Sequence, residues 1–418
     1  MTYSSQQVRS NPAADAAALL NRIGVGILTL LVPTLLMVAR HPVFVLFPVG
    51  VALIIIAALL DPQNHTGTQM RLGLLSPIMA AFLLFFLWSW VSLLWAPHKI
   101  DAALRYGKVM GTLGVGLLAV AFMPERTRLA NLYLAAIGLG AAVVAGLVLA
   151  VLWRWRGESA RFADDASLVR GALGAVVLLW PALGALALRA RWDRATLLAG
   201  GVAVLTLLTG ATLAAAALVV GILVFALAVN RPMVAGMVVA SLTGVLMLAA
   251  PLLPTMASWL MPHMAGLPQV QGVLASVVPW RQIFSSEGAG LLIGHGIDAA
   301  AQKAMAGLLP SAAINGILFQ IWFDLGLLGA FFGAALIGLG LWAAARADAR
   351  LAPFMVAGIA SALTIAATHF TLSQIWWVNV VGVAGLVMAH NLRGLYIEER
   401  PKLRGAMRGD QEIGAAAE

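Results

Sequence analysis

Runs of apolar residues recur along the whole chain and are separated by short polar segments. A bilayer core of roughly 30 Å needs about 20 mostly apolar residues per helix, so each run predicts a membrane-spanning helix. We count about twelve spans, which predicts an all-α integral membrane protein. The predicted spans are residues 23–40, 43–60, 75–95, 107–124, 131–153, 171–189, 196–210, 211–229, 233–253, 316–345, 353–370 and 375–391.

Composition agrees with a membrane protein, because 61% of the residues are apolar and only 10% are charged. The chain has no cysteine, which excludes disulfides and thiolate metal sites. Residues 1–22 are polar and lack the apolar region of a cleaved signal peptide. We therefore expect the first span to act as the insertion signal.

The basic residues predict the orientation of the chain. Most of them fall in the two tails and in the connections on the same side as the tails, which predicts cytoplasmic termini. This bias largely explains the net charge of +9, so no nucleic-acid partner is expected. The predicted organisation is a cytoplasmic tail (1–22), nine spans (23–253), a long outer loop with short helices (254–315), three spans (316–391) and a cytoplasmic tail (392–418).

Some basic residues would lie on the outer side of the membrane, where the positive-inside rule does not account for them. Most of these residues fall in two segments, RWRGESARFADDASLVRG and the loop 254–315. Arg170 and Arg281 have two interpretations each. Their guanidinium groups hold a diphosphate through paired hydrogen bonds, or they reach lipid headgroups at the membrane surface. Arg161, in the first segment, is a further candidate for substrate binding.

The stretch GLLIGHGID places His295 between Gly294 and Gly296. Glycines allow a ligand to approach the backbone closely, and a histidine serves as a base or a hydrogen-bond donor. A turn with a surface histidine is the alternative interpretation.

The stretch NGILFQIWFDLGLLG opens the tenth predicted span and carries Asn315, Gln320 and Asp324. Gln320 and Asp324 are four residues apart and share one face of a helix. Polar groups in a span face other helices or a water-filled cavity, since facing lipid is costly. Two interpretations follow, either helix-to-helix hydrogen bonding or a cavity wall with Asn315 at its rim.

These motifs, in this order, resemble the O-antigen ligase/polymerase superfamily of bacterial inner membranes. The resemblance covers about residues 75–391 and rests on LVRGALGAVVLLWP, PWRQIF, IGHGID, FQIWFDLGLLG and SQIWW. In the ligases, a His-Asn pair precedes a G-x-x-G motif by nine residues. Gly326 and Gly329 match the glycine pair, whereas Asn315 and Gly316 stand where the His-Asn pair is expected.

The resemblance implies a GT-C-like, metal-independent glycosyltransferase without a cofactor, in the bacterial inner membrane with its active site facing the periplasm. Its donor would be a glycan on undecaprenyl diphosphate, its acceptor a glycan or a lipid such as lipid A core, and membrane lipids would surround it. Arg170 and Arg281 match the family's arginines that hold the diphosphate.

Asparagine orients a hydroxyl but does not take its proton at neutral pH, so the position of Asn315 leaves three possibilities. The chain lacks the usual ligase mechanism, or His295 substitutes as the base, or activity is lost. Polymerases of the same superfamily often lack the His-Asn pair, so polymerisation is an alternative to ligation. A multi-span glycolipid transporter is an alternative from another class.

Overall fold

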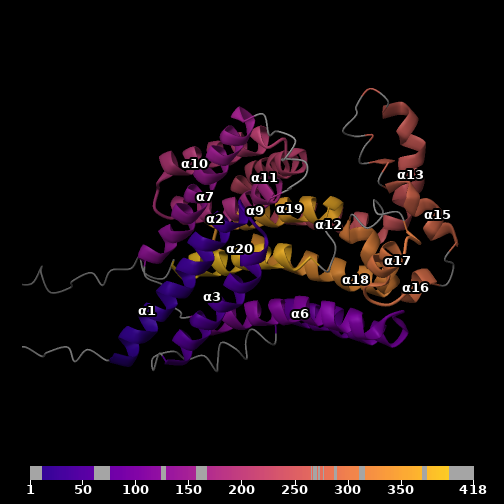
Figure 1. Cartoon of the computed structure of the whole chain (residues 1–418), viewed down its shortest axis with the longest axis horizontal. Helices are drawn as coiled ribbons and strands as arrows, with labels where there is room; N and C mark the ends of the chain where they lie inside the picture. Colours follow the sequence, from indigo (N-terminus) through magenta and orange to yellow (C-terminus); the bar gives the residue numbers. More distant parts are fainter. Residues whose placement is uncertain are drawn as a thin grey trace, which may run out of the picture.

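The computed structural model describes residues 12–60, 76–123, 129–156, 167–264, 277–286, 290–309, 316–369 and 374–394, with isolated positions 266, 271, 274 and 275. Every regular element in these residues is helical, which confirms the all-α class (Figure 1). The long helices are α1 (Pro12–Gly26), α3 (His41–Leu60), α5 (Pro77–Val91), α6 (Lys99–Phe122), α7 (Leu129–Trp155), α9 (Ser167–Ala187), α10 (Trp192–Leu208), α11 (Thr212–Asn230), α12 (Pro232–Leu248), α18 (Ile317–Ala345), α19 (Ala352–His369) and α20 (Ile375–Gly394). Short elements are η1 (Ile27–Leu31), α2 (Val32–Leu36), η2 (Ser92–Trp95), η3 (Ala250–Leu252), α13 (Leu253–Leu260), η4 (Met261–Met264), α15 (Pro279–Ser286), α16 (Gly290–Ile293) and α17 (Ala299–Met305).

Eight helices in the described residues are long and apolar enough to cross a membrane, or nine if a bent pair counts as one span. The chain is therefore an integral membrane protein. The count of twelve stays a prediction, because α10 and α19 are short and α6 carries Arg105 and Lys108 in its first half. The first helix begins at Pro12 rather than at residue 23, since the alanines between Pro12 and Asn21 favour a helix.

Helix α9 lies at the centre of the bundle and contacts α7, α10, α19 and α20. Small residues allow this close packing. A Cβ on Gly171 would lie 2.5 Å from the sulfur of Met37, and one on Gly174 would lie 2.3 Å from a methyl of Leu36. Helices in lipid associate through such small-residue contacts rather than through the hydrophobic effect.

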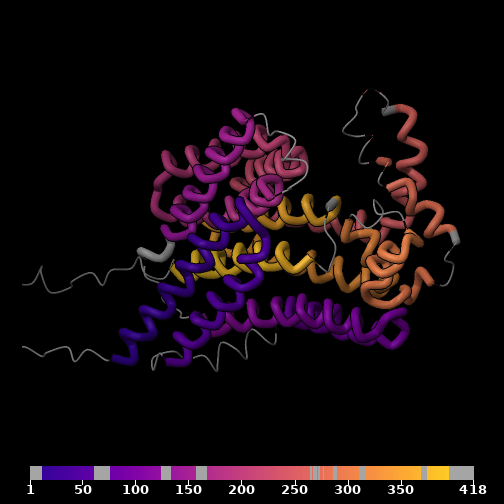
Figure 2. The backbone as a smooth tube through the Cα atoms, in the orientation of Figure 1, coloured from indigo at the N-terminus to yellow at the C-terminus, as the bar shows by residue number. Residues whose placement is uncertain are grey.

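The two ends of the described chain meet in the bundle. Helix α20 contacts α3 and α6, and the amide of Asn379 donates to the carbonyl of Val43 at 3.1 Å. Figure 2 shows the same arrangement, with the indigo N-terminal helices beside the yellow C-terminal ones. Residues far apart in sequence thus form one helical assembly.

The predicted loop 254–315 contains short helices, as expected, in α13, η4, α15, α16 and α17. These helices gather at one end of the molecule, around the first half of α18 (Figure 1). Trp280 of α15 stacks on Phe319 and contacts Phe323 of α18, at ring distances of 5.5 and 5.8 Å. The periplasmic location of this loop stays a prediction.

Candidate functional site

Helix α18 is interrupted at Gly326, whose backbone has φ 68° and ψ −162°. A side chain is excluded there, because a Cβ would lie 2.6 Å from the backbone nitrogen of Gly294. Such a break removes the usual helical donors for the carbonyl groups of the preceding turn. An unsatisfied carbonyl is costly in a membrane segment, so these groups need other partners.

Segment 294–298 and Trp88 supply those partners. The backbone nitrogen of His295 donates to the carbonyl of Phe323 at 2.9 Å, and that of Gly296 donates to the carbonyl of Asp324 at 3.0 Å. The indole nitrogen of Trp88, on α5, donates to the carbonyl of Leu325 at 2.9 Å. The GHGID stretch is therefore built into the break of α18 by backbone hydrogen bonds.

Gly294 and Gly296 make this docking sterically feasible. Both have positive φ, 81° and 94°. A Cβ on Gly294 would lie 2.4 Å from the carbonyl oxygen of Asp324, and one on Gly296 would lie 2.5 Å from the Cα of Ala96. The sequence predicted close approach of a ligand to these glycines. In this structure the group that approaches them is the protein's own backbone, and ligand binding at Gly294 and Gly296 stays a prediction.

Asp324 is fully buried and binds the start of α17. Its carboxylate accepts from the backbone nitrogens of Asp298 at 3.1 Å and Ala300 at 2.8 Å. The amide of Gln320 donates to the same carboxylate at 3.3 Å. Both predicted polar residues of the span therefore face protein partners, and Asp324 fastens the loop to α18.

Asp298 links the docked loop to α6. Its carboxylate lies 3.2 Å from the guanidinium of Arg105 and 3.4 Å from the amide of Gln302. Burial raises the pKa of Asp298 above its ordinary value, and the Arg105 guanidinium offsets that rise only in part. Asp298 also has a positive φ of 68°, which aspartate tolerates better than most side chains do.

His295 is half-buried and stacks on the ring of Phe323, with centroids 4.2 Å apart. Its Nδ1 lies 3.0 Å from the carbonyl oxygen of Phe323. A carbonyl only accepts, so Nδ1 carries the hydrogen and Nε2 of the neutral ring is the basic nitrogen. The Lys303 ammonium lies 4.8 Å from the centroid of the same Phe323 ring. The Lys303 ammonium and the oriented His295 ring thus both contact the ring of Phe323.

Arg281 is exposed on α15, one residue after buried Trp280, and donates to the hydroxyl of Ser258 on α13 at 3.2 Å. Arg170 lies in the first turn of α9, within the central bundle. Figure 1 shows helices α9 and α15 apart from each other, so the predicted joint action of the two arginines on one diphosphate stays a prediction. Arg161 and Asn315 lie outside the described residues.

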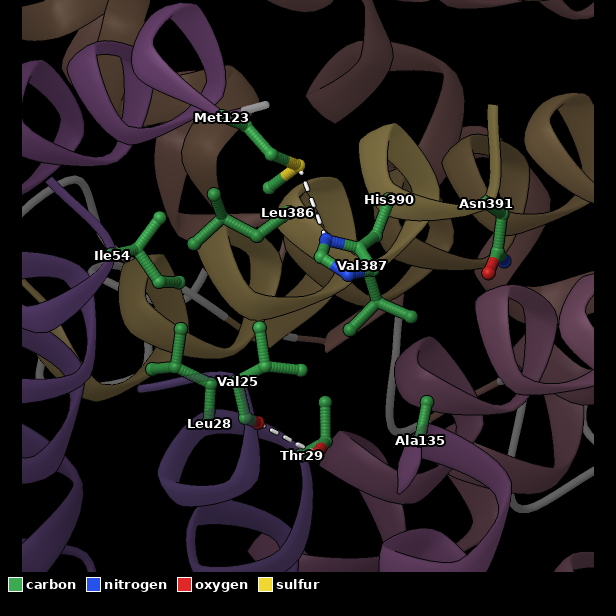
Figure 3. Close-up of a pocket in the computed structure, with 10 residues that line it drawn as sticks. All are labelled: Val25, Leu28, Thr29, Ile54, Met123, Ala135, Leu386, Val387, His390 and Asn391. Atoms are coloured by element: carbon green, nitrogen blue, oxygen red, sulfur yellow. Dashed lines mark hydrogen bonds between the residues drawn. The ribbon is translucent and has the colours of Figure 1, made fainter. Parts of the chain in front are cut away.

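A second candidate site is a mainly apolar cavity of about 20 Å³ in the bundle, enough for one water molecule. His390 projects into it from α20, with Nδ1 3.2 Å from the sulfur of Met123 (Figure 3). His390 Nε2 and Asn391 Oδ1 are buried without a protein partner. The lining residues are Val25, Leu28, Thr29, Ile54, Met123, Ala135, Leu386, Val387, His390 and Asn391. Its size excludes a sugar or a lipid headgroup.

Sequence reasoning did not single out Arg105, Asp298, Lys303 or Trp88 as parts of this site. Lys303 lies in the loop 254–315, where basic residues are concentrated, and Asp298 belongs to the GHGID stretch, so two weak signals were present. The sequence pattern gave no indication of a role for Trp88, because a tryptophan within an apolar run resembles any lipid-facing residue. In the described parts of the chain, no three His, Asp or Glu side chains are grouped to hold a metal ion.

Comparison with known proteins gives no information on the site, so its description rests on geometry. No family model, no curated protein and no solved structure matches this chain.

Proposed function

We propose that the protein is an inner-membrane glycosyltransferase that moves a glycan from undecaprenyl diphosphate to an acceptor hydroxyl on the periplasmic side. Two observations support this. The ordered motifs resemble the O-antigen ligase/polymerase superfamily, and one end of the molecule joins an oriented histidine to basic side chains. The single observation on which the proposal depends most is the bond between His295 Nδ1 and the carbonyl of Phe323, at 3.0 Å.

In the proposed reaction, the acceptor oxygen bonds to the anomeric carbon while the bond from that carbon to the diphosphate breaks. The bond's electron pair leaves with undecaprenyl diphosphate, and the acceptor proton goes to His295 Nε2. His295 thereby takes the role that the family histidine would have at position 315. Basic groups offset the negative charge that develops on the departing diphosphate.

Lys303 and Arg281 are the basic residues we assign to the diphosphate. Lys303 and His295 both contact the ring of Phe323, and Arg281 is exposed at the same end of the molecule. Arg170 has no part in this assignment because α9 lies in another region (Figure 1). The proposal retains twelve spans, with residues 254–315 in the periplasm.

Transfer from a purified undecaprenyl-diphosphate glycan in nanodiscs tests the proposal. His295→Ala should lower the rate by about 10²–10⁴-fold, the usual effect of removing a general base. Lys303→Met should cost about 10²–10³-fold if it stabilises charge in the transition state. Arg350→Ala is the matched control, because Arg350 is exposed and its carboxylate contact is Asp348 two residues away.

A wild-type rate in the His295→Ala variant would refute the role of this histidine. A wild-type chain that transfers no glycan to any supplied acceptor would refute the function. The product pattern also separates two activities, because ligation adds one donor glycan whereas polymerisation gives a ladder.

Transport of a glycolipid is a second candidate, favoured by the break of α18 at Gly326. Discontinuous spanning helices are typical of secondary transporters, where they line the substrate site. Movement of the lipid-linked glycan across proteoliposomes without any acceptor would support transport, and acceptor-dependent product would support transfer.

A further inference from the structure

A continuous apolar stripe leaves the bundle along α12 and continues onto α13. Its members are all exposed and are spaced three or four residues apart, so they follow one side of the helical path. They are Val238, Leu242, Val245, Leu248, Leu252, Met256 and Trp259. Helix α12 and the helical segment Ala250–His263 after the bend together form a candidate broken span or re-entrant loop, so we take the exposed stripe on α12 to face lipid.

The direction of the chain changes between the two helices, by 62°. Figure 1 shows α6, α18 and α20 running lengthwise, whereas α13 stands crosswise at one end and projects from the bundle. A helix that turns from the span direction in this way comes closer to the membrane plane. The apolar stripe remains outward after the bend, where Leu252 of η3 and Met256 and Trp259 of α13 are 64%, 63% and 71% exposed.

Polar and basic groups flank the stripe at this end. Trp259 contacts the ring of His263, with centroids 5.2 Å apart, and Arg281 donates to Ser258 at 3.2 Å. Pro254 and Ala257, on the opposite side of α13, are buried against the protein. A tryptophan and an arginine beside large apolar residues match the boundary between acyl chains and anionic headgroups.

We propose that α13 is an interfacial helix that lies on one leaflet of the bilayer, with Leu252, Met256 and Trp259 among the acyl chains. Its partner is the phospholipid surface, and Arg281 lies at the level of the lipid phosphates. The continuity of the stripe with the lipid-facing side of α12 distinguishes this partner from a soluble protein.

The interfacial helix also fixes the depth of the candidate site. Arg281 links α13 to α15, and Trp280 of α15 packs on Phe319 and Phe323 beneath the ring of His295. Contact of α13 with lipid therefore holds His295 close to headgroup level. This inference stands on the stripe and the bend, and it does not depend on the glycan-transfer proposal.

The absence of cysteine makes the test direct, because a single introduced cysteine is labelled without background. Met256→Cys and, as the matched control, Ser285→Cys on the exposed side of α15 are each labelled with an environment-sensitive fluorophore. The full chain is reconstituted in vesicles of phosphatidylcholine and phosphatidylglycerol. Quenching is then measured with doxyl lipids, which sit in the bilayer, and with iodide, which stays in water.

We expect severalfold stronger doxyl quenching at position 256 than at 285, and the reverse order for iodide. Equal responses at the two positions would overturn the inference, as would protection of position 256 from both quenchers, which indicates coverage by a second copy. If Met256→Cys does not fold, Leu252→Cys reports the same face.

Discussion

Replacement of Asp324 by asparagine isolates the contact that fastens the docked loop to α18. Its two carboxylate oxygens accept from the backbone nitrogens of Asp298 and Ala300 at 3.1 and 2.8 Å. Asparagine keeps one oxygen and replaces the other with an amide group that donates. One of the two backbone N–H groups therefore loses its acceptor and faces another donor.

A buried donor left without a partner costs about 1–3 kcal/mol, so the docked arrangement should be weakened by this amount. Every 1.4 kcal/mol is a factor of ten, which gives about a 5- to 150-fold rise in the population of the undocked loop. The global fold should persist, because the large core around α9 does not include Asp324.

Hydrogen exchange measured by mass spectrometry on peptides covering 290–309 detects this change. The amides of Asp298 and Ala300 should exchange faster by the calculated factor, while peptides from α9 keep their wild-type rates. Asp348→Asn is the control, since Asp348 forms an exposed ion pair with Arg350 two residues away, outside the docked loop. An exchange rate within twofold of wild type at 290–309 would refute the anchoring role of Asp324.

Further predictions concern the same region. Gly326→Ala should abolish folding or docking, whereas Gly338→Ala, where a Cβ meets open space, should leave melting unchanged or slightly higher. Trp88→Phe should orphan the carbonyl of Leu325, cost about 1–3 kcal/mol and lower the melting temperature. Because burial raises the pKa of Asp298, the folded state binds its proton at higher pH than the unfolded state does, so stability falls as pH rises above about 4. Asp298→Asn should flatten that part of the melting profile.

The apolar pattern predicted most helices well because long apolar runs leave the chain little choice in lipid. The predicted span 43–60 corresponds to α3, and 211–229 corresponds to α11, each within two residues at both ends. The predicted span 316–345 corresponds to α18, yet nothing in the pattern signalled its break. Gly326 adopts a positive φ because a distant segment docks there, and one glycine in an apolar run does not show this.

The candidate site was predictable only where side chains carry a signal. Shared helical spacing predicted that Gln320 and Asp324 act on one face, and they form a hydrogen bond. The main partners of Asp324 are backbone nitrogens of the loop, which have no sequence signature. The pairing of Arg105 with Asp298 joins residues 193 positions apart, and no local pattern predicts such a contact.

The hydrogen-bond donors at the break of α18 all lie before the break in the sequence, and this order affects how the protein is synthesised and inserted. Trp88 and the segment 294–300 all precede Gly326 in the chain, so the ribosome completes them before α18 enters the membrane. The carbonyl groups that lose their helical donors at the break therefore find hydrogen-bond donors already in place. They are not left unsatisfied in lipid during insertion. A rearranged gene that encoded α18 first would remove this advantage, and its product should be cleared by membrane quality control at a higher rate.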